Sequence, residues 1–316
     1  KVKTSFSGKE RPTWFLYSGI PDQWNRKFGE MMSIPAFRHS FNKCARYLSF
    51  RGINFNPFAG ETNCDSNAPS TTFALTCAVQ IALTDTLSEL GVTHADGIIG
   101  YSAGEIACAY ADRCLTAEQC IDIAYLYGYA MEYVKLDKEF FSTAVVSLSW
   151  EEAVSQCPHG IFPTCNNAAR SVTVAGPSEM LSQYLKAIQR NGVHIQSTHN
   201  ASSAASHTPY MEKAAHYYEH WLDEKYKLCK WNRSERWVTT SATKLNLSIA
   251  KYYAGNQRDF VNLFEALKGI PNDAIVIEVP PSVYDLFLWI HNVNYMMSQK
   301  EYRNRAAESV GILYST

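Results

Sequence analysis

A serine between two glycines is the first candidate for chemistry in this chain. Residues 96–104 read DGIIGYSAG, an apolar run followed by a Gly-x-Ser-x-Gly pattern, and Glu105 then opens a predicted helix. A sharp strand-to-helix turn lifts a serine side chain above the edge of a sheet. The first turn of such a helix also offers unpaired backbone N–H groups to a developing oxyanion. Ser102 is therefore a candidate nucleophile, provided that the chain supplies a base.

Histidine is the side chain best suited to take the proton of a serine hydroxyl near neutral pH. Of the nine histidines, we favour His207, because the segment SSAASH places it on a loop of small residues just before a predicted helix. His199, eight residues earlier, is the alternative base. His216 and His220 have the i, i+4 spacing of a metal-binding pair, but no third ligand has a suitable spacing. We expect these two to be solvated or interfacial side chains.

Composition excludes several classes of function. With 316 residues the chain can form one large domain or two of ordinary size. Hydrophobic residues make up 46% and charged residues 19%, which is typical of a soluble globular protein. The net charge of -1 and the pI of about 6.8 argue against a nucleic-acid binder. No signal peptide or transmembrane run is visible, so no membrane association is expected.

The nine cysteines are scattered and lie mostly in apolar stretches, without zinc-like spacing. They predict buried reduced thiols, no metal site and a cytoplasmic location. The chain begins at Lys1 without methionine, which we interpret as a sign that it is a piece of something larger.

Alternating strands and helices must position the candidate residues. Predicted strands cover 13–17, 95–100, 237–240 and 274–279, and predicted helices cover 25–32, 71–90, 105–111, 116–133, 208–226 and 260–267. This order indicates an α/β layered domain with a mostly parallel sheet.

The stretch after residue 135 has a different pattern. Strands at 142–148, 161–164, 171–175 and 193–197, with helices at 150–157 and 178–189, give the strand–helix–strand–strand–helix–strand order of a ferredoxin-like unit. We therefore expect a core formed by residues 1–135 and 205–316, with residues 136–204 as an inserted subdomain.

Taken together, these segments resemble a known family. From RPTWFLYSGIPDQW, which begins at Arg11, to AAESVGILYS near the end, the chain is similar to the acyltransferase (malonyl/acetyltransferase) domain of animal-type fatty acid synthases and related polyketide synthases. The densest similarity lies in DGIIGYSAGEIACAYADRCLTAEQCIDIAYLYG and in AASHTPYMEKA. The resemblance implies an α/β-hydrolase-like core with a mostly parallel sheet plus an inserted ferredoxin-like subdomain.

The resemblance also implies an activity and its residues. An acyl group would move from coenzyme A to Ser102, with His207 as the base, and then to the phosphopantetheine thiol of an acyl carrier protein. Gln23 and the backbone N–H of Ala103 would line the oxyanion hole. No acidic third member is implied, because in this family a backbone carbonyl can hold the imidazole. No bound cofactor is expected.

Partners follow from the same resemblance. They are acyl-CoA, an acyl carrier protein, and neighbouring ketosynthase and linker domains of a cytoplasmic multienzyme for lipid or polyketide synthesis. Because such carriers are acidic, Lys135, Lys138 and Arg170 are candidates for a basic docking surface.

Three positions bear on the acyl donor when the chain is compared with the family pattern. Tyr127 stands where malonyl-selective members carry an arginine that binds the free carboxylate of the substrate. Tyr101 precedes the nucleophile where histidine is usual in the family. Ser206 before His207 is similar to the YASH segment of methylmalonyl-selective members and leaves room for a larger or branched acyl chain, but we give the missing arginine more weight than its suggestion of a carboxylated group. These residues predict a pocket for a monocarboxylic or branched acyl donor.

Alternatives remain open at this stage. The domain could be a degenerate, non-acylating scaffold, or a malonyl- or methylmalonyl-selective transferase with a different carboxylate anchor. An α/β-hydrolase esterase would need an acid between Ser102 and His207. The aspartates in that interval follow the serine too soon: Asp112, Asp122 and Asp137.

Overall fold

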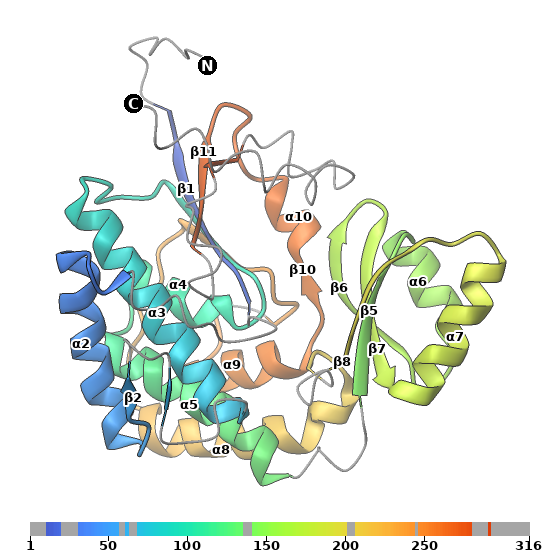
Figure 1. Ribbon diagram of the computed structural model, residues 1–316, viewed down its shortest axis with the longest axis horizontal. Helices are drawn as coiled ribbons and strands as arrows, with labels where there is room; N and C mark the ends of the chain where they lie inside the picture. Colours follow the sequence, from blue (N-terminus) through green and yellow to red (C-terminus); the bar gives the residue numbers. More distant parts are fainter. Residues whose placement is uncertain are drawn as a thin grey trace.

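The computed structural model describes residues 11–19, 31–56, 61–62, 68–134, 141–200, 206–243, 246–279 and 290–291. Within them the chain forms two five-stranded sheets. Figure 1 shows a larger body around the first sheet and a smaller body around most of the second.

The first sheet has the order β12-β11-β1-β4-β9. Its strands are β1 (Thr13–Tyr17), β4 (Gly97–Gly100), β9 (Trp237–Val238), β11 (Ile275–Val279) and β12 (Ile290–His291). Every pairing is parallel except that of β12 with β11. The predicted mostly parallel α/β architecture is therefore confirmed.

Helices cover both faces of this sheet. They are α2 (Pro35–Phe50), α3 (Pro69–Glu89), α4 (Gly104–Ala111), α5 (Ala117–Tyr133), α8 (Glu212–Tyr226), α9 (Ile249–Arg258) and α10 (Leu263–Leu267). Alternate residues of β1 point to opposite faces: Phe15 and Tyr17 join the main core with α2 to α5, α8 and α9, whereas Trp14 and Leu16 pack with α10.

Helix α3 lies at the centre of the main core and contacts both α2 and α5. Most of its side chains are buried, as expected for a helix that is apolar on nearly all sides. Helix α5 begins with the predicted capping box, in which Thr116 and Gln119 bond each other's backbone N–H groups.

The second sheet has the order β10-β6-β7-β5-β8. It contains β5 (Phe141–Val146), β6 (Phe162–Ala168), β7 (Ser171–Pro177), β8 (Ile195–Asn200) and β10 (Val261–Asn262), with helices α6 (Trp150–Gln156) and α7 (Ser178–Arg190) packed on it. The pairings among β5 to β8 are antiparallel. Their order is that of the predicted ferredoxin-like unit.

One strand of this sheet comes from outside the expected insert. β10 pairs in parallel with β6, with Val261 opposite Cys165. The prediction of one helix over 260–267 is thus wrong at its start, because this pairing takes the first residues and α10 begins only at Leu263. The division of the chain into 1–135 with 205–316 and 136–204 stays a prediction.

Other boundaries differ locally. The last strand of the insert begins at Ile195 and not at residue 193, because Gly192, with φ of 84°, ends α7 by donating to the Gln189 carbonyl. The predicted helix from Thr208 starts as a 3-10 turn, η2 (Pro209–Met211). Helices α2 and α9 and the small hairpin of β2 (Phe55–Asn56) and β3 (Glu61–Thr62) were not anticipated. Most of the predicted helix at 25–32 lies outside the described residues.

The eight cysteines within the described residues are all free thiols. No helix in the described part of the chain has the length and apolar character needed to span a membrane.

Candidate active site

Ser102 lies at the turn between β4 and α4, at the carboxyl end of a strand near the middle of the first sheet. Its φ of 56° is in the left-handed region, which a sharp strand-to-helix turn requires. Both flanking glycines are needed for space: a Cβ on Gly100 would lie 2.5 Å from the Glu105 nitrogen, and one on Gly104 would lie 2.2 Å from the Tyr17 carbonyl oxygen. The sequence pattern is therefore a steric requirement of this turn.

His207 meets Ser102 from a distant part of the chain. Its Nε2 lies 2.6 Å from the Ser102 Oγ, and its Nδ1 lies 2.9 Å from the backbone carbonyl oxygen of Asp259. A carbonyl oxygen can only accept, so Nδ1 carries the proton and Nε2 is free to accept the serine hydroxyl. The backbone N–H of His207 donates to the Gln257 carbonyl at 2.9 Å, which fixes the loop at a φ of 63°.

Burial controls the charge of this imidazole. His207 is 7% exposed, and desolvation lowers its pKa to about 4, outweighing the opposing effect of the carbonyls of Asp259 and Asn256. The imidazole is therefore neutral at physiological pH and ready to act as a base.

This pKa leads to a pH prediction. Only the neutral imidazole can accept a proton, so the rate of Ser102 acylation should be flat from about pH 6 to 8 and fall only as the pH approaches 4. The check is the single-turnover acylation rate between pH 3.5 and 8, with circular dichroism confirming the fold at each pH. A midpoint near 6.5, the ordinary value for histidine, would contradict it.

Of the two predicted oxyanion donors, the backbone N–H of Ala103 belongs to the described residues. The N–H of Ala103, at the start of α4, donates to no acceptor among the described residues. Gly19 lies beside the nucleophile, since a Cβ built on it would be 3.6 Å from the Ser102 Cβ. Gln23, the second predicted donor, lies outside the described residues, four positions after Gly19. Its role stays a prediction.

The three predicted acyl-pocket residues lie around the Ser102–His207 pair. Tyr101, next to the nucleophile, donates its hydroxyl to the Asn167 Oδ1 at 3.1 Å, which links β4 to β6 of the second sheet. Tyr127 is fully buried, and burial raises its pKa while the side chain of Ser206 partly offsets this effect. Ser206 directly precedes His207, so the Tyr127 hydroxyl lies near the candidate base.

The aspartates considered as the acid of an esterase do not contact His207 where the structure describes them. Asp112 accepts from Arg236 and Ser234, and Asp122 is bound by Arg51, Lys225 and Tyr226, so neither carboxylate contacts His207. Asp137, Lys135 and Lys138 lie outside the described residues.

The structure also describes the three other histidines considered as bases or metal ligands, and Arg170. The backbone of His199 pairs with Thr143 in the second sheet. On α8, His216 contacts the Tyr217 ring and His220 faces Glu224. Arg170 is exposed and lies 3.3 Å from Glu152. Within the described residues no group of three or more His, Cys, Asp or Glu side chains is arranged to hold a metal ion.

Sequence reasoning missed the supports of the pair. Asp259 contributes only a backbone carbonyl, and Gln257 holds His207 by its carbonyl while its side chain donates to the Tyr127 carbonyl at 2.8 Å. Glu105, recognised only as the start of a helix, is completely buried and binds Trp237 and Thr240. The sequence signal for Glu105 was an acidic residue directly after the Gly-x-Ser-x-Gly pattern.

Comparison with known proteins identifies the family of this chain. The Acyl transferase domain family matches residues 14–292. The chain belongs to this family of acyl transferase domains. The match includes β1, the elbow, the His207 loop and β11.

Relatives and solved structures agree with the acyl transferase assignment. The chain is 27% identical over 270 residues to the highly reducing polyketide synthase cnsI of Penicillium expansum, covering 82% of this chain and 11% of that protein. It is 31% identical over 211 residues to dmxL2 of Cryptosporiopsis, covering 63% and 9%. The acyltransferase domain of PpsC of Mycobacterium tuberculosis has the same fold, with a TM-score of 0.72 at 19% identity, over 85% of this chain and 82% of that one. The chain thus spans about a tenth of the length of the curated relatives it matches.

Proposed function

We propose that this acyl transferase domain moves an acyl group from coenzyme A to Ser102 and then to the phosphopantetheine thiol of an acyl carrier protein, as one domain of a polyketide synthase. The 2.6 Å contact between the Ser102 Oγ and the His207 Nε2 carries this proposal. The relatives are polyketide synthases, and one structure of similar fold is that of a type II polyketide synthase acyl-carrier protein in complex with its malonyl-transacylase. In such a synthase, ketosynthase and linker domains would be neighbours.

The geometry supports a two-stage mechanism. The Ser102 Oγ attacks the thioester carbonyl and passes its proton to the His207 Nε2, while the Ala103 N–H and, by the proposal, Gln23 stabilise the oxyanion. The tetrahedral intermediate collapses, and the leaving thiolate of coenzyme A takes the proton from His207. The carrier thiol then attacks the seryl ester, gives its proton to His207, and the Ser102 oxygen leaves and regains a proton.

The donor we propose is a monocarboxylic or branched acyl group. Tyr127 packs between Phe73, at 4.3 Å between ring centroids, and Tyr218, at 5.5 Å. Among the described residues, no cation–π contact involves the Tyr127 ring. A buried carboxylate without a cation costs several kcal/mol, whereas room for one methyl group changes binding by only ~1–3 kcal/mol.

This donor preference is testable with a panel of acyl-CoA esters. We expect acetyl-, propionyl- or isobutyryl-CoA to acylate Ser102 at least about tenfold faster than malonyl-CoA, because each 1.4 kcal/mol of lost binding is a factor of ten. The measurement is the rate of adduct formation on the Ser102 peptide by mass spectrometry. Faster acylation by malonyl- or methylmalonyl-CoA would show a different carboxylate anchor, and no adduct from any ester would show a scaffold domain.

A further inference from the structure

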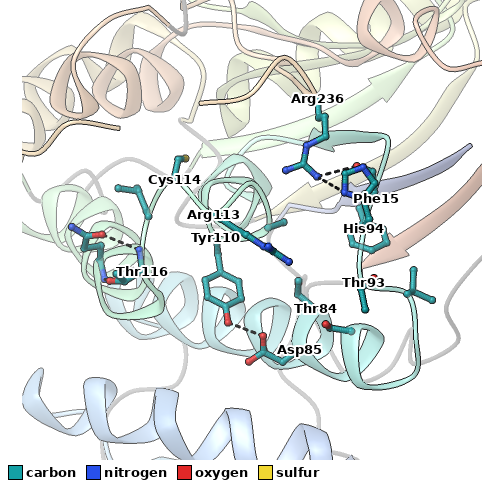
Figure 2. Close-up of a pocket in the computed structure, with 16 residues that line it drawn as sticks. Phe15, Thr84, Asp85, Thr93, His94, Tyr110, Arg113, Cys114, Thr116 and Arg236 are labelled. Carbon is teal, nitrogen blue, oxygen red and sulfur yellow. Dashed lines mark hydrogen bonds between the residues drawn. The ribbon is translucent and has the colours of Figure 1, made fainter. Parts of the chain in front are cut away.

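A cavity of about 650 Å³ lies at the opposite end of α4 from Ser102. Ser102 precedes the first turn of this eight-residue helix and Arg113 follows its last turn, so the helix separates them by about 12 Å. The cavity is lined by residues of β1, α3, the loop before β4, the end of α4, the α4–α5 turn and the start of α5, together with Arg236 (Figure 2). None of the candidate active-site residues lines this cavity, which we call the far cavity.

Arg113 is the unusual member of the lining. Its φ of 62° places it in the left-handed region after the C-cap of α4, a position that favours glycine. Its side chain is exposed and makes no hydrogen bond or ion pair within the part of the chain that the structure describes. Figure 2 shows it extended into the far cavity between Tyr110 and His94. An arginine thus occupies a strained position and presents an uncommitted guanidinium to the cavity.

A second cation and a neutral donor lie beside it. The Arg236 guanidinium donates to the Ala95 carbonyl at 3.0 Å and to the His94 Nδ1 at 3.3 Å, and pairs with buried Asp112. Because Nδ1 accepts, the proton of neutral His94 lies on Nε2, which makes that nitrogen a donor. The last carbonyls of α4 do not oppose an anion strongly, since those of residues 108, 109 and 110 already accept backbone N–H groups.

Hydroxyl groups and one carboxylate also line the far cavity. The Asp85 carboxylate accepts from the Tyr110 hydroxyl at 2.6 Å and from the Ser40 hydroxyl at 2.5 Å. Ser88 and Thr93 add exposed hydroxyls to the lining. The far cavity therefore presents two arginines, several hydroxyls and one carboxylate, and its volume is that of a small-molecule site.

We propose that the far cavity binds a small phosphate monoester, with its phosphate on Arg113 and the hydroxyls of its organic part toward Asp85, Ser88 and Thr93. A planar guanidinium binds a phosphate through two parallel hydrogen bonds. Hydroxyl groups on the ligand suit the rest of the lining, because they can donate to the Asp85 carboxylate. This site is independent of the proposed acyl transfer.

Calorimetric titration of the whole chain tests this inference, with glucose 6-phosphate, AMP and inorganic phosphate as probes. Wild type should bind the phosphate probes, whereas glucose and acetate at equal concentration should give no signal. Arg113→Gly should raise the Kd at least about tenfold, since hydrogen bonds to charged groups contribute ~1.5–3 kcal/mol. The same variant should raise the Tm of the unliganded protein by about 1–2 °C, because glycine tolerates the left-handed backbone.

The matched control is Arg46→Gln, which removes an exposed arginine of α2 outside the far cavity and should leave the Kd within about twofold of wild type. The proposal is overturned if wild type binds none of the three phosphate probes below about 10 mM. It is also overturned if Arg113→Gly binds them as tightly as wild type, or if acetate binds equally well. Acylation of Ser102 is measured separately, so failure here leaves the proposed transferase activity untouched.

Discussion

Replacing Ser102 with alanine is expected to lower the rate of acylation from acyl-CoA by at least ~10⁴-fold, to the level of an untreated control. The hydroxyl is the atom that would carry the acyl group, and no other described nucleophile contacts His207. The backbone at this position is left-handed with either residue, so the variant should keep the wild-type Tm. Intact-mass spectrometry after incubation with acetyl-CoA measures the effect.

His207→Ala gives the second arm of this experiment. Because the two side chains act as one unit, the loss should be similar in size to that of Ser102→Ala, and the double variant should be no worse than either. His216→Ala, on the exposed face of α8, is the matched control and should stay within about twofold of wild type. A full adduct on folded Ser102→Ala would place the nucleophile elsewhere and end the proposed mechanism.

The elbow was predictable because local sterics determine it. A buried apolar strand, two glycines without room for a Cβ and a following helix all lie within ten residues, so the sequence itself carries the constraint. The pairing of Ser102 with His207 was different. The two residues are 105 positions apart. No spacing rule links them, and His207 was favoured on its loop of small residues and on the resemblance to a family.

The residues that support the Ser102–His207 pair could not be predicted from sequence patterns. The acceptor for the His207 Nδ1 is a backbone carbonyl, and the side chain of Asp259 gives no indication of it. The short strand β10 was not predicted either, because Val261 becomes a strand residue only by pairing with Cys165 about a hundred positions away. Helix α9, which holds both Asn256 and Gln257, has completely buried polar residues that an amphipathic pattern does not predict.

Glu105 joins the nucleophile turn to those supports. Its carboxylate accepts from the Trp237 Nε1 at 2.6 Å, the Thr240 N–H at 2.7 Å and the Thr239 hydroxyl at 2.9 Å. The Tyr253 hydroxyl of α9 reaches the Glu105 carbonyl at 3.4 Å. Burial raises the pKa of this carboxyl, and the donated hydrogen bonds oppose the shift. Glu105 therefore connects α4, which follows Ser102, to β9 through its side chain and to the helix that supports His207 through its backbone carbonyl.

Glu105→Ala should lower the free energy of unfolding by about 3–5 kcal/mol, because several buried donors would lose their acceptor at once. Glu105→Gln keeps one acceptor oxygen and should lose less. The check is urea unfolding followed by circular dichroism. Glu89→Ala, at the exposed end of α3, is the matched control and should change stability by no more than about 0.5 kcal/mol. A loss below about 1 kcal/mol for Glu105→Ala would mean that water replaces the carboxylate, and that the elbow and the His207 loop are held together by other contacts.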